Sequence, residues 1–315
     1  MKSNNNLRPN CFDEYIGQKN IIENLKIFIE SAIKRKDSLD HILLNGNSGL
    51  GKTSLAILIA KTMSKKIYTL NGTSLQKPSD IISPLTSLKE GEFLFIDEVH
   101  ACSKEVFEVL YPVLEDGRIN VIIGKEYNSK IINIKLANFT LIAATTEINK
   151  LSIPFINRFP INFNFKDYND EEIAKIIEIN IKKININLNY KTINIISKYC
   201  KSNPRVAINL LKRLQDYIIC DNVNIVDENT ILKILNKLEI YKYGISSLEI
   251  NYLKLLQNYK ILGLEHIAQL LSLSQSIIVS NIEPILYKNS LIIKTPKGRK
   301  ITSKGEIYLR KINSI

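Results

Sequence analysis

The chain of 315 residues is 45% hydrophobic and 23% charged, the balance of a globular protein with room for two or three domains. Its 43 Lys and Arg residues outnumber its 31 Asp and Glu residues. The net charge of +12 suits a polyanionic partner such as nucleic acid, although a lysine-rich composition alone gives the same total. The sequence shows no signal segment and no apolar run near the ~18 residues of a membrane span, so we expect a soluble cytoplasmic protein with no membrane segment. It contains no C-x-x-C pair, so we expect free thiols.

A glycine-rich segment has the spacing of a phosphate-binding loop. Gly46, Gly51, Lys52 and Thr53 fit the pattern G-x-x-x-x-G-K-[ST]. The apolar stretch HILLN before it predicts a buried strand, and TSLAILIAKTM at its end has the spacing of a helix. Backbone N–H groups and the helix N-terminus would surround the phosphates, Lys52 would reach the β- and γ-phosphates, and the Thr53 hydroxyl would ligate Mg²⁺.

Apolar strands alternate with helices through the first half of the chain. The predicted order around the loop is helix 13–36, strand 65–72, strand 91–102, helix 103–117 and strand 138–147. Ser103 is the expected N-cap of the second helix. This alternation predicts a mostly parallel sheet covered by helices on both faces.

Polar side chains end two of these strands. Asp97 and Glu98 follow four apolar residues, at the sheet edge where sites of open α/β sheets lie. Asp97 would hold the Mg²⁺ shell and Glu98 would orient and polarise the attacking water, because phosphoryl transfer needs mainly positioning and charge neutralisation. Thr145 and Thr146 end the next strand, where a hydroxyl could sense the γ-phosphate; two strand residues without such a role are the alternative.

Two arginines occupy positions from which they could complete a site. Arg158 lies between the sheet region and the helices that follow, and Arg205 opens a helix after Asn203 and Pro204. An arginine at a subunit edge can complete a neighbour's active site and raise its rate by ~10³–10⁵-fold. A surface salt bridge is the alternative for each.

The rest of the chain contains two hairpins and a run of helices. After about residue 166 the strands stop and four helices are predicted, and after about 241 short helices lead to a β-hairpin at 289–303. Another hairpin is predicted at 119–136. Its apolar residues cannot all be buried on the hairpin itself, so it indicates a partner site, unless it extends the core sheet.

Several segments in this order resemble AAA+ ATPases, namely the phosphate loop, FIDEVH, AATT, NRFP and NPRVA. The resemblance is closer to the RuvB family, the bacterial branch-migration motors for Holliday junctions. RPNCFDEYIGQ near the start of the chain and TPKGR near its end resemble segments that are more specific to that family than the ATPase motifs are. The similarity runs from about Leu7 to about residue 310.

The resemblance implies an α/β fold of three domains: an AAA+ P-loop ATPase domain over 1–165, a helical lid over 166–240 and a winged-helix DNA-binding domain over 241–315. It implies an ATP hydrolase that assembles as a homo-hexameric ring on double-stranded DNA and migrates four-way junctions. RuvA would bind the 119–136 hairpin, and RuvC would be a further partner. A clamp-loader-like ATPase and an ATP-gated DNA-binding initiator are the alternatives.

The resemblance also implies roles at matching positions. The residues expected to contact ATP are Leu7, Arg8, Gly49, Gly51, Lys52, Thr53, Ser54, Glu115, Asp116, Gly117, Arg158, Tyr168 and Arg205. Of these, the segment 115–117 would lie near the adjoining subunit's nucleotide, Arg158 would be the finger acting in trans, and Arg205 would be the second sensor. The residues expected to carry catalysis are Lys52, Asp97, Glu98, Thr146 as first sensor, Arg158 and Arg205, with Mg²⁺ at Thr53 and Asp97.

A basic cluster near the end of the chain agrees with a DNA-binding wing. The segment from Lys288 to Lys311, both included, contains eight Lys or Arg residues and one acid. The residues expected to contact duplex phosphates are Lys294, Lys297 and Arg299; a solvated basic face is the alternative.

Four positions depart from the family's pattern. Asn47 and Ser48 replace two prolines of the phosphate loop, which should loosen the loop but spare the ligands. Ile156 stands where the first of two arginines is expected, and Pro160 replaces a glycine. If the missing arginine matters, coupling between subunits is the property in doubt.

Overall fold

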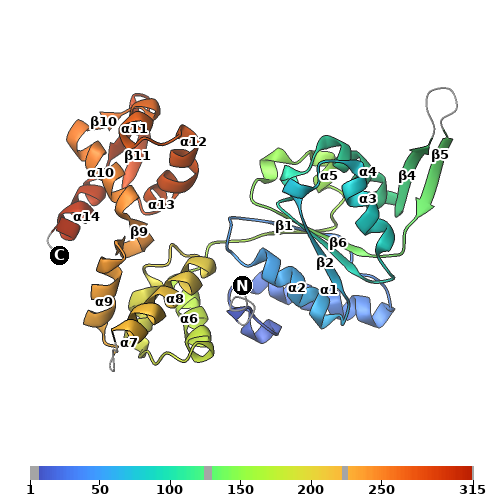
Figure 1. Ribbon diagram of the computed structural model, residues 1–315, viewed down its shortest axis with the longest axis horizontal. Coiled ribbons are helices and arrows are strands. Elements are labelled where there is room, and N and C mark those ends of the chain that lie inside the picture. The colour runs from blue at the N-terminus through green and yellow to red at the C-terminus, as the bar shows by residue number, and fades with distance from the viewer. Residues whose placement is uncertain (1–6, 124–129, 222–225, 314–315) are drawn as a thin grey trace. The chain divides into compact units, whose positions relative to one another are not determined.

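The computed structural model describes residues 7–123, 130–221 and 226–313 of the chain (Figure 1). They form two compact units, Met1–Tyr168 and Asn169–Ile315. The four cysteines are free, as predicted. Among the helices of these described ranges, none is long and apolar enough to cross a membrane.

A five-stranded parallel sheet forms the centre of the first unit. Its order is β2 (Ile67–Asn71), β3 (Phe93–Asp97), β6 (Thr140–Thr145), β1 (Ile42–Asn45) and β7 (Ile161–Asn164). Side chains of β3 and β6 are buried along nearly their whole length, as continuous apolar runs predict for strands covered on both faces. The register sets Asn45 beside Thr145 and Asn71 beside Asp97, so the C-terminal ends of these strands share one edge of the sheet.

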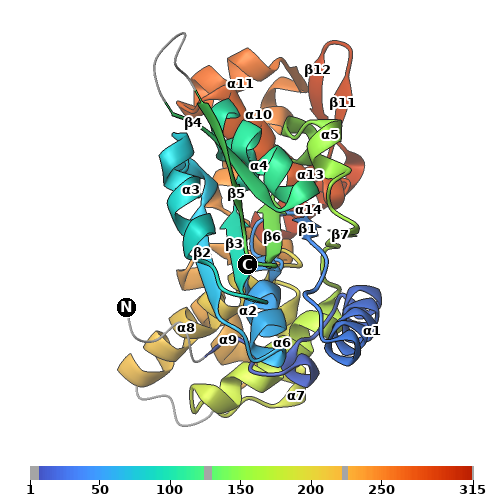
Figure 2. The same ribbon diagram turned by 90° about the vertical axis from the view of Figure 1, so that its right-hand side faces the viewer.

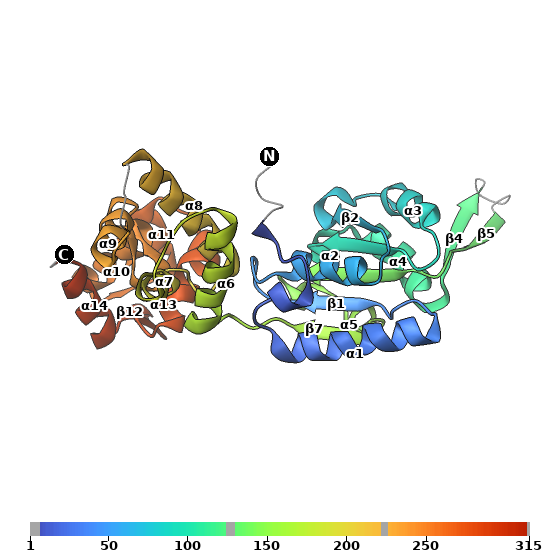
Figure 3. The same ribbon diagram turned by 90° about the horizontal axis from the view of Figure 1, so that it is seen from below.

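Helices cover both faces of this sheet. The first unit contains α1 (Lys19–Arg35), α2 (Lys52–Thr62), α3 (Pro78–Ser87), α4 (Lys104–Asp116) and α5 (Ile153–Ile156). Apolar residues of α3, α4 and α5 form one core cluster with Leu94 and Ile96 of β3 (Figure 2). The alternate residues Phe93 and Phe95 are fully buried on the opposite face, because successive side chains of a strand point to opposite sides. In Figure 3, α1 runs alongside β1 and β7.

An antiparallel hairpin of β4 (Arg118–Ile123) and β5 (Lys130–Lys135) extends from the end of α4 and makes a separate two-stranded sheet (Figure 1). Ile119, at its base, belongs to the core cluster, whereas Ile132 and Ile134 are exposed. The turn expected at 125–129 and the side chains of Val121, Ile123 and Ile131 lie outside the described residues. The described part of the hairpin therefore carries apolar side chains that the chain itself does not cover.

The second unit begins with the predicted helical region. It consists of α6 (Asp170–Lys183), α7 (Tyr190–Ser197), α8 (Pro204–Cys220) and α9 (Glu228–Lys237). Side-chain oxygens of Asn169, Asn189, Asn203 and Asp227 accept hydrogen bonds from the first backbone N–H groups of these helices, so each helix begins at a residue that favours an N-cap.

The C-terminal part of the second unit combines helices with a small sheet. The helices are α10 (Ser247–Tyr259), α11 (Leu264–Leu271), α12 (Gln275–Ile277), α13 (Glu283–Lys288) and α14 (Ser303–Asn313). Strands β10 (Ile261–Leu262), β12 (Gly298–Ile301) and β11 (Ile292–Thr295) form the sheet, and β11 and β12 are the predicted hairpin. Lys201 Nζ lies 2.6 Å from Glu249 Oε1, and the Tyr243 N–H donates to the Lys198 carbonyl over 2.9 Å, so contacts join this part to the helical region.

Candidate functional site

The loop between β1 and α2 has the backbone of an anion-binding turn. Gly46, Gly49 and Gly51 all have positive φ angles, of 148°, 83° and 102°. A Cβ on Gly46 would meet Phe165, and one on Gly51 would meet the Tyr15 hydroxyl, so only glycine suits both conformation and packing. α2 begins directly after Gly51, which places the N–H groups and the partial positive charge of a helix N-terminus at the loop.

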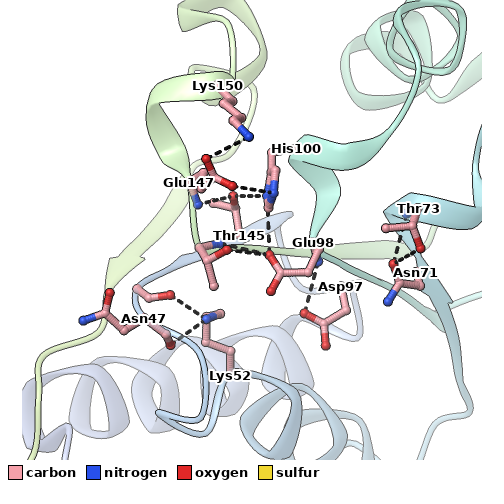
Figure 4. A network of polar contacts seen from close by, with 12 residues as sticks. Asn47, Lys52, Asn71, Thr73, Asp97, Glu98, His100, Thr145, Glu147 and Lys150 are labelled. Atoms are coloured by element: carbon pink, nitrogen blue, oxygen red, sulfur yellow. Dashed lines mark hydrogen bonds and ion pairs between the residues drawn. The ribbon is translucent and has the colours of Figure 1, made fainter. Parts of the chain in front are cut away.

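Lys52 is buried at the start of α2 and points back over the loop. Its Nζ donates to the carbonyls of Gly46 over 2.6 Å and Asn47 over 3.0 Å (Figure 4). The ammonium is thus held inside the curve of the loop, where a phosphate chain would replace the carbonyl oxygens as its partner.

Thr53 and Asp97 meet although 44 residues separate them along the chain. The Thr53 hydroxyl donates to Asp97 Oδ2 over 2.9 Å, and the N–H of Glu98 donates to Asp97 Oδ1 over 3.1 Å. Both side chains bear oxygen ligands of the kind that Mg²⁺ prefers. In the described part of the chain, no group of three or more His, Cys, Asp or Glu side chains could hold a metal ion, so a divalent ion here would need further oxygens from a phosphate ligand or water.

Glu98 sits in a constrained turn after β3. Its φ of 50° is in the left-handed region, and its Oε2 accepts hydrogen bonds from the Thr146 hydroxyl over 2.8 Å and the Thr146 N–H over 3.2 Å. Gly72 packs beneath this turn, where a Cβ would overlap the Glu98 carbonyl oxygen. The structure therefore brings the predicted water-activating residue and the predicted first sensor into direct contact.

His100 is a member of this cluster that the sequence analysis missed. Its Nδ1 lies 3.0 Å from Thr145 Oγ1 and 3.4 Å from Glu98 Oε2, and its Nε2 lies 3.3 Å from Glu147 Oε1 (Figure 4). A hydrogen bond from Lys150 lowers the pKa of Glu147 and keeps this outer carboxylate charged. The available signal was position: a histidine two residues after Glu98, on the short 3-10 turn Val99–Ala101, is set to face back toward the strand ends.

Two tyrosines support the phosphate loop from outside it. The Tyr168 hydroxyl donates to the Leu50 carbonyl over 3.0 Å, and the Tyr15 hydroxyl donates to the Gly51 carbonyl over 3.2 Å. Burial raises the pKa of Tyr15, which therefore stays protonated as a donor. Leu7 is buried in the same unit and Ser54 is half-buried on α2. Tyr168 is one of the residues predicted to contact the nucleotide. Tyr15 is not among the predicted residues, and only the structure shows its contact with the loop.

Arg158 is held by residues of its own chain. Its Nη2 lies 2.6 Å from Glu115 Oε2, its Nη1 donates to the Pro154 carbonyl over 2.7 Å, and its guanidinium lies 4.9 Å from the centre of the Tyr111 ring. Asp116 ends α4 and Gly117 follows with φ 63°. The structure thus brings Arg158 together with the 115–117 segment, and the role of both toward a neighbouring subunit stays a prediction.

Arg205 belongs to the second unit, at the start of α8. Its N–H donates to Asn203 Oδ1 over 2.9 Å, and its side chain is exposed. Arg8 lies in the first unit, just before the 3-10 turn Phe12–Glu14. The expected nucleotide contacts of Arg8 and Arg205 stay predictions.

The basic residues of the C-terminal hairpin fall into two kinds. Lys294 and Lys297 are exposed. Arg299 Nε instead lies 2.7 Å from Glu283 Oε1, with side chains only 11% and 4% exposed, and Tyr252 donates to the same carboxylate. This hydrogen bond to Glu283 raises the pKa of Arg299. Arg299 therefore anchors the wing in addition to any contact with DNA.

A parallel sheet, a glycine-rich loop leading into α2 and an acidic pair at the end of β3 define a P-loop nucleotide-binding ATPase. Family models agree in three consecutive segments: the Holliday junction DNA helicase RuvB P-loop domain matches residues 7–165, the RuvB AAA lid domain 168–241 and the RuvB C-terminal winged helix domain 242–310. The chain belongs to the RuvB family, and the predicted fold class and family are confirmed.

Relatives and solved structures match over nearly the full length. The Holliday junction branch migration complex subunit RuvB of Mycoplasmopsis pulmonis is 42% identical over 99% of this chain and 100% of its own. The subunit of the same name from Mycoplasma genitalium is 39% identical over 96% of this chain and 97% of its own. The structure of the Thermotoga maritima RuvB Holliday junction branch migration motor superposes with a TM-score of 0.84 at 32% identity, covering 97% of this chain and 98% of that one.

Proposed function

We propose that this chain is the ATP-hydrolysing motor subunit that drives branch migration of Holliday junctions. One observation carries the proposal beyond family membership. The side chains that would carry hydrolysis lie together at one sheet edge, where Thr53 donates a hydrogen bond to Asp97 and Thr146 donates one to Glu98. The relatives' shared name, branch migration complex subunit, supports the DNA role.

ATP would lie across the phosphate loop of the first unit. The residues that would hold its phosphates are Gly49, Gly51, Lys52, Thr53 and Ser54, and those that would contact its other parts are Leu7, Arg8, Tyr168 and Arg205. Lys52 is already aimed into the curve of the loop and would neutralise charge on the β- and γ-phosphates. Thr53 and Asp97 would hold Mg²⁺, which when bound neutralises phosphate charge and orients the γ-phosphate.

Hydrolysis would use Glu98 as the group that orients water. Its carboxylate would accept a hydrogen bond, and then the proton, from a water molecule in line with the γ-phosphorus. Thr146, which binds the same carboxylate, would exchange that contact for one to the γ-phosphate and so report the state of the nucleotide.

Neighbouring subunits of a homo-hexameric ring would complete each site. Arg158 would act in trans, after leaving its ion pair with Glu115, and Glu115, Asp116 and Gly117 would line the adjoining nucleotide. Ile156 leaves Arg158 without the other arginine that the family's pattern has two residues before it. A single arginine would therefore carry the coupling between subunits.

DNA and partner proteins would bind away from the ATP site. Domains at 1–165, 166–240 and 241–315 would serve as motor, lid and DNA-binding winged helix. Lys294 and Lys297, with Arg299, would contact duplex phosphates without reading sequence. RuvA would bind the apolar residues of the 119–136 hairpin, of which Ile132 and Ile134 are exposed, and RuvC would join the same junction complex.

ATP-dependent separation of a synthetic four-way DNA junction, with and without a RuvA protein, tests the proposal. Glu98→Gln is the control, because it keeps the hydrogen bonds of the site and removes the base. Separation into two duplex arms by the wild type and not by the control supports the motor. ATP hydrolysis with neither the junction nor a simple fork unwound would leave an ATP-gated DNA-binding switch or a clamp-loader-like ATPase.

A further inference from the structure

His100 connects the segment after β3 to the end of β6, at the edge of the sheet where the proposed site lies. It follows β3 on a short 3-10 turn, and its ring faces Glu98 of its own segment, Thr145 at the end of β6 and Glu147 beyond it (Figure 4). Its side chain is 11% exposed, against 31% for Glu98 and 44% for Glu147. The imidazole therefore lies behind the more accessible carboxylate that would meet water.

The hydrogen bonds around Thr145 fix how the ring is used. Thr145 Oγ1 accepts the N–H of Glu147 over 3.0 Å and keeps a second lone pair for an Nδ1–H of His100 at 3.0 Å. The same Nδ1–H faces the Glu98 carboxylate, and Nε2 lies 3.3 Å from Glu147 Oε1 on the other side of the ring. The contacts on the two sides of the ring fix its orientation, in which Nδ1 lies 3.4 Å from Glu98 Oε2 and its hydrogen points toward that carboxylate.

His41 shows what a structural histidine looks like in the same unit. Its Nδ1 accepts the Leu141 N–H over 3.0 Å, its ring packs against Phe139, and burial lowers its pKa to about 4. It precedes β1, at the opposite edge of the sheet from the phosphate loop. His100 instead contacts polar groups of the proposed site, so its position needs a reason other than packing.

We propose that His100 is a positioning residue for ATP hydrolysis. Its ring holds the Glu98 carboxylate and the Thr145–Thr146 strand end in register, so that the base and the first sensor occupy a fixed arrangement when ATP is bound. This inference rests on the proposed function, because His100 would act only through Glu98, the residue proposed to orient the attacking water. The groups that hold ATP itself are not among its contacts.

The inference predicts a loss in turnover with little loss in binding. We expect His100→Leu, which fills a similar volume without polar atoms, to lower kcat roughly 10-fold, below the ~10²–10⁴-fold contribution of a general base. We expect KM for ATP to change by less than about twofold, because the phosphate contacts remain. His100→Asn places an amide near the site of Nδ1 and should recover most of kcat, whereas His100→Gln reaches toward Glu147 and should recover less.

The experiment measures steady-state ATP hydrolysis by the full chain, affinity for a fluorescent ADP analogue and thermal unfolding for each variant. His41→Leu is the matched control: we expect lower thermal stability with an unchanged kcat. The same measurements are made on the single variants His100→Leu and Glu98→Gln and on the double variant that combines them. If His100 acts through Glu98, the combined variant equals Glu98→Gln alone.

Each outcome decides between the two ideas. A wild-type kcat for His100→Leu, an equal fall in kcat and ADP affinity, or a further 10-fold loss on top of Glu98→Gln would overturn the positioning role while leaving the motor intact. If Glu98→Gln hydrolyses ATP at the wild-type rate, Glu98 is not the group that activates water. That result overturns the proposed function, and the role of His100 with it. Where Glu98→Gln is too slow for the combined measurement, failure of His100→Asn to exceed His100→Leu overturns the inference.

Discussion

The carboxylates at the sheet edge of the first unit and two buried carboxylates of the second unit are used in opposite ways. In the first unit, Asp97, Glu98 and Glu147 lie at the sheet edge and are partly exposed to solvent. Asp97 and Glu98 accept hydrogen bonds from the hydroxyl groups of threonines. In the second unit, the carboxylates of Glu249 and Glu283 are buried and pair with charged and polar groups of the chain. Glu249 pairs with Lys201 and accepts the Ser246 N–H, and Glu283 accepts from Arg299 and Tyr252.

The difference shows that environment, not residue type, decides what a carboxylate does. An open carboxylate keeps lone pairs that can accept hydrogen bonds from water or ligate a metal ion, and little free energy is lost when one of its hydrogen bonds breaks. A buried carboxylate has lost its solvent and depends on its partners, so it fixes the position of one element against another. Lys201 lies four residues before Arg205, so the segment that carries the predicted second sensor is tied to α10 through Glu249.

The largest expected effect lies in the first unit, at Lys52. Lys52→Ala removes the ammonium held inside the phosphate loop, and we expect ATP hydrolysis to fall by roughly 10³-fold or more. Junction migration should disappear with it, while thermal stability changes little. Normal junction migration by this variant would show that the loop is not the phosphate site.

Breaking the buried pair of the second unit should affect stability instead. Arg299→Met leaves the Glu283 carboxylate without its charged partner, and we expect a loss of about 3 kcal/mol in the free energy of unfolding. Arg213→Met is the control, because its pair with Asp216 is exposed. Urea unfolding measures both; equal effects of the two variants would contradict the division between buried and open pairs.

Acid should weaken the first unit through His41. Burial lowers the pKa of this histidine to about 4 in the folded state, from an ordinary value near 6.5. Unfolding therefore takes up a proton between these values, so stability is complete above about pH 6.5 and is lost as the pH falls toward 4. We expect this group alone to account for about 2 kcal/mol between pH 8 and pH 5. Urea unfolding of the wild type and His41→Leu at both pH values isolates the effect, and equal pH dependence in the two proteins would refute it.

Helix caps should matter equally in both units. Ser103 accepts the Val106 N–H at the start of α4, and Asn203 accepts the Arg205 and Val206 N–H groups at the start of α8. We expect Ser103→Ala and Asn203→Ala each to lower the free energy of unfolding by about 1 kcal/mol. A much larger loss for Asn203→Ala in urea unfolding would mean that this residue supports more than the helix end.

The smallest effect is expected for single exposed lysines of the wing. Lys294→Ala should weaken duplex DNA binding several-fold and reduce the slope of log K against log salt by about 1, with stability unchanged. Titration of a labelled duplex at several salt concentrations measures both quantities. An unchanged slope would place Lys294 outside the DNA contact, and Lys297→Ala repeats the test beside it.

The sequence by itself determined the features that depend on near neighbours. The glycine spacing predicted a loop between β1 and α2, and only glycine fits the observed conformation at Gly46 and Gly51. The apolar runs predicted the buried strands, and Ser103 and Asn203 stand at the helix starts where local hydrogen bonding favours them. The order of the motifs also predicted the family, because each motif is a short segment whose function depends on residues adjacent in the sequence.

Only the tertiary structure decided which distant side chains meet. Whether Glu98 faces Thr146 and His100 depends on the parallel pairing of β3 with β6 and on the left-handed turn after β3. Arg299 looked like its neighbours Lys294 and Lys297 in the sequence, yet its strand position turns it toward Glu283 of α13. Such partners come from elements far apart along the chain, and no local pattern records them. They follow from how strands align and helices pack, which is fixed by the free energy of the whole core.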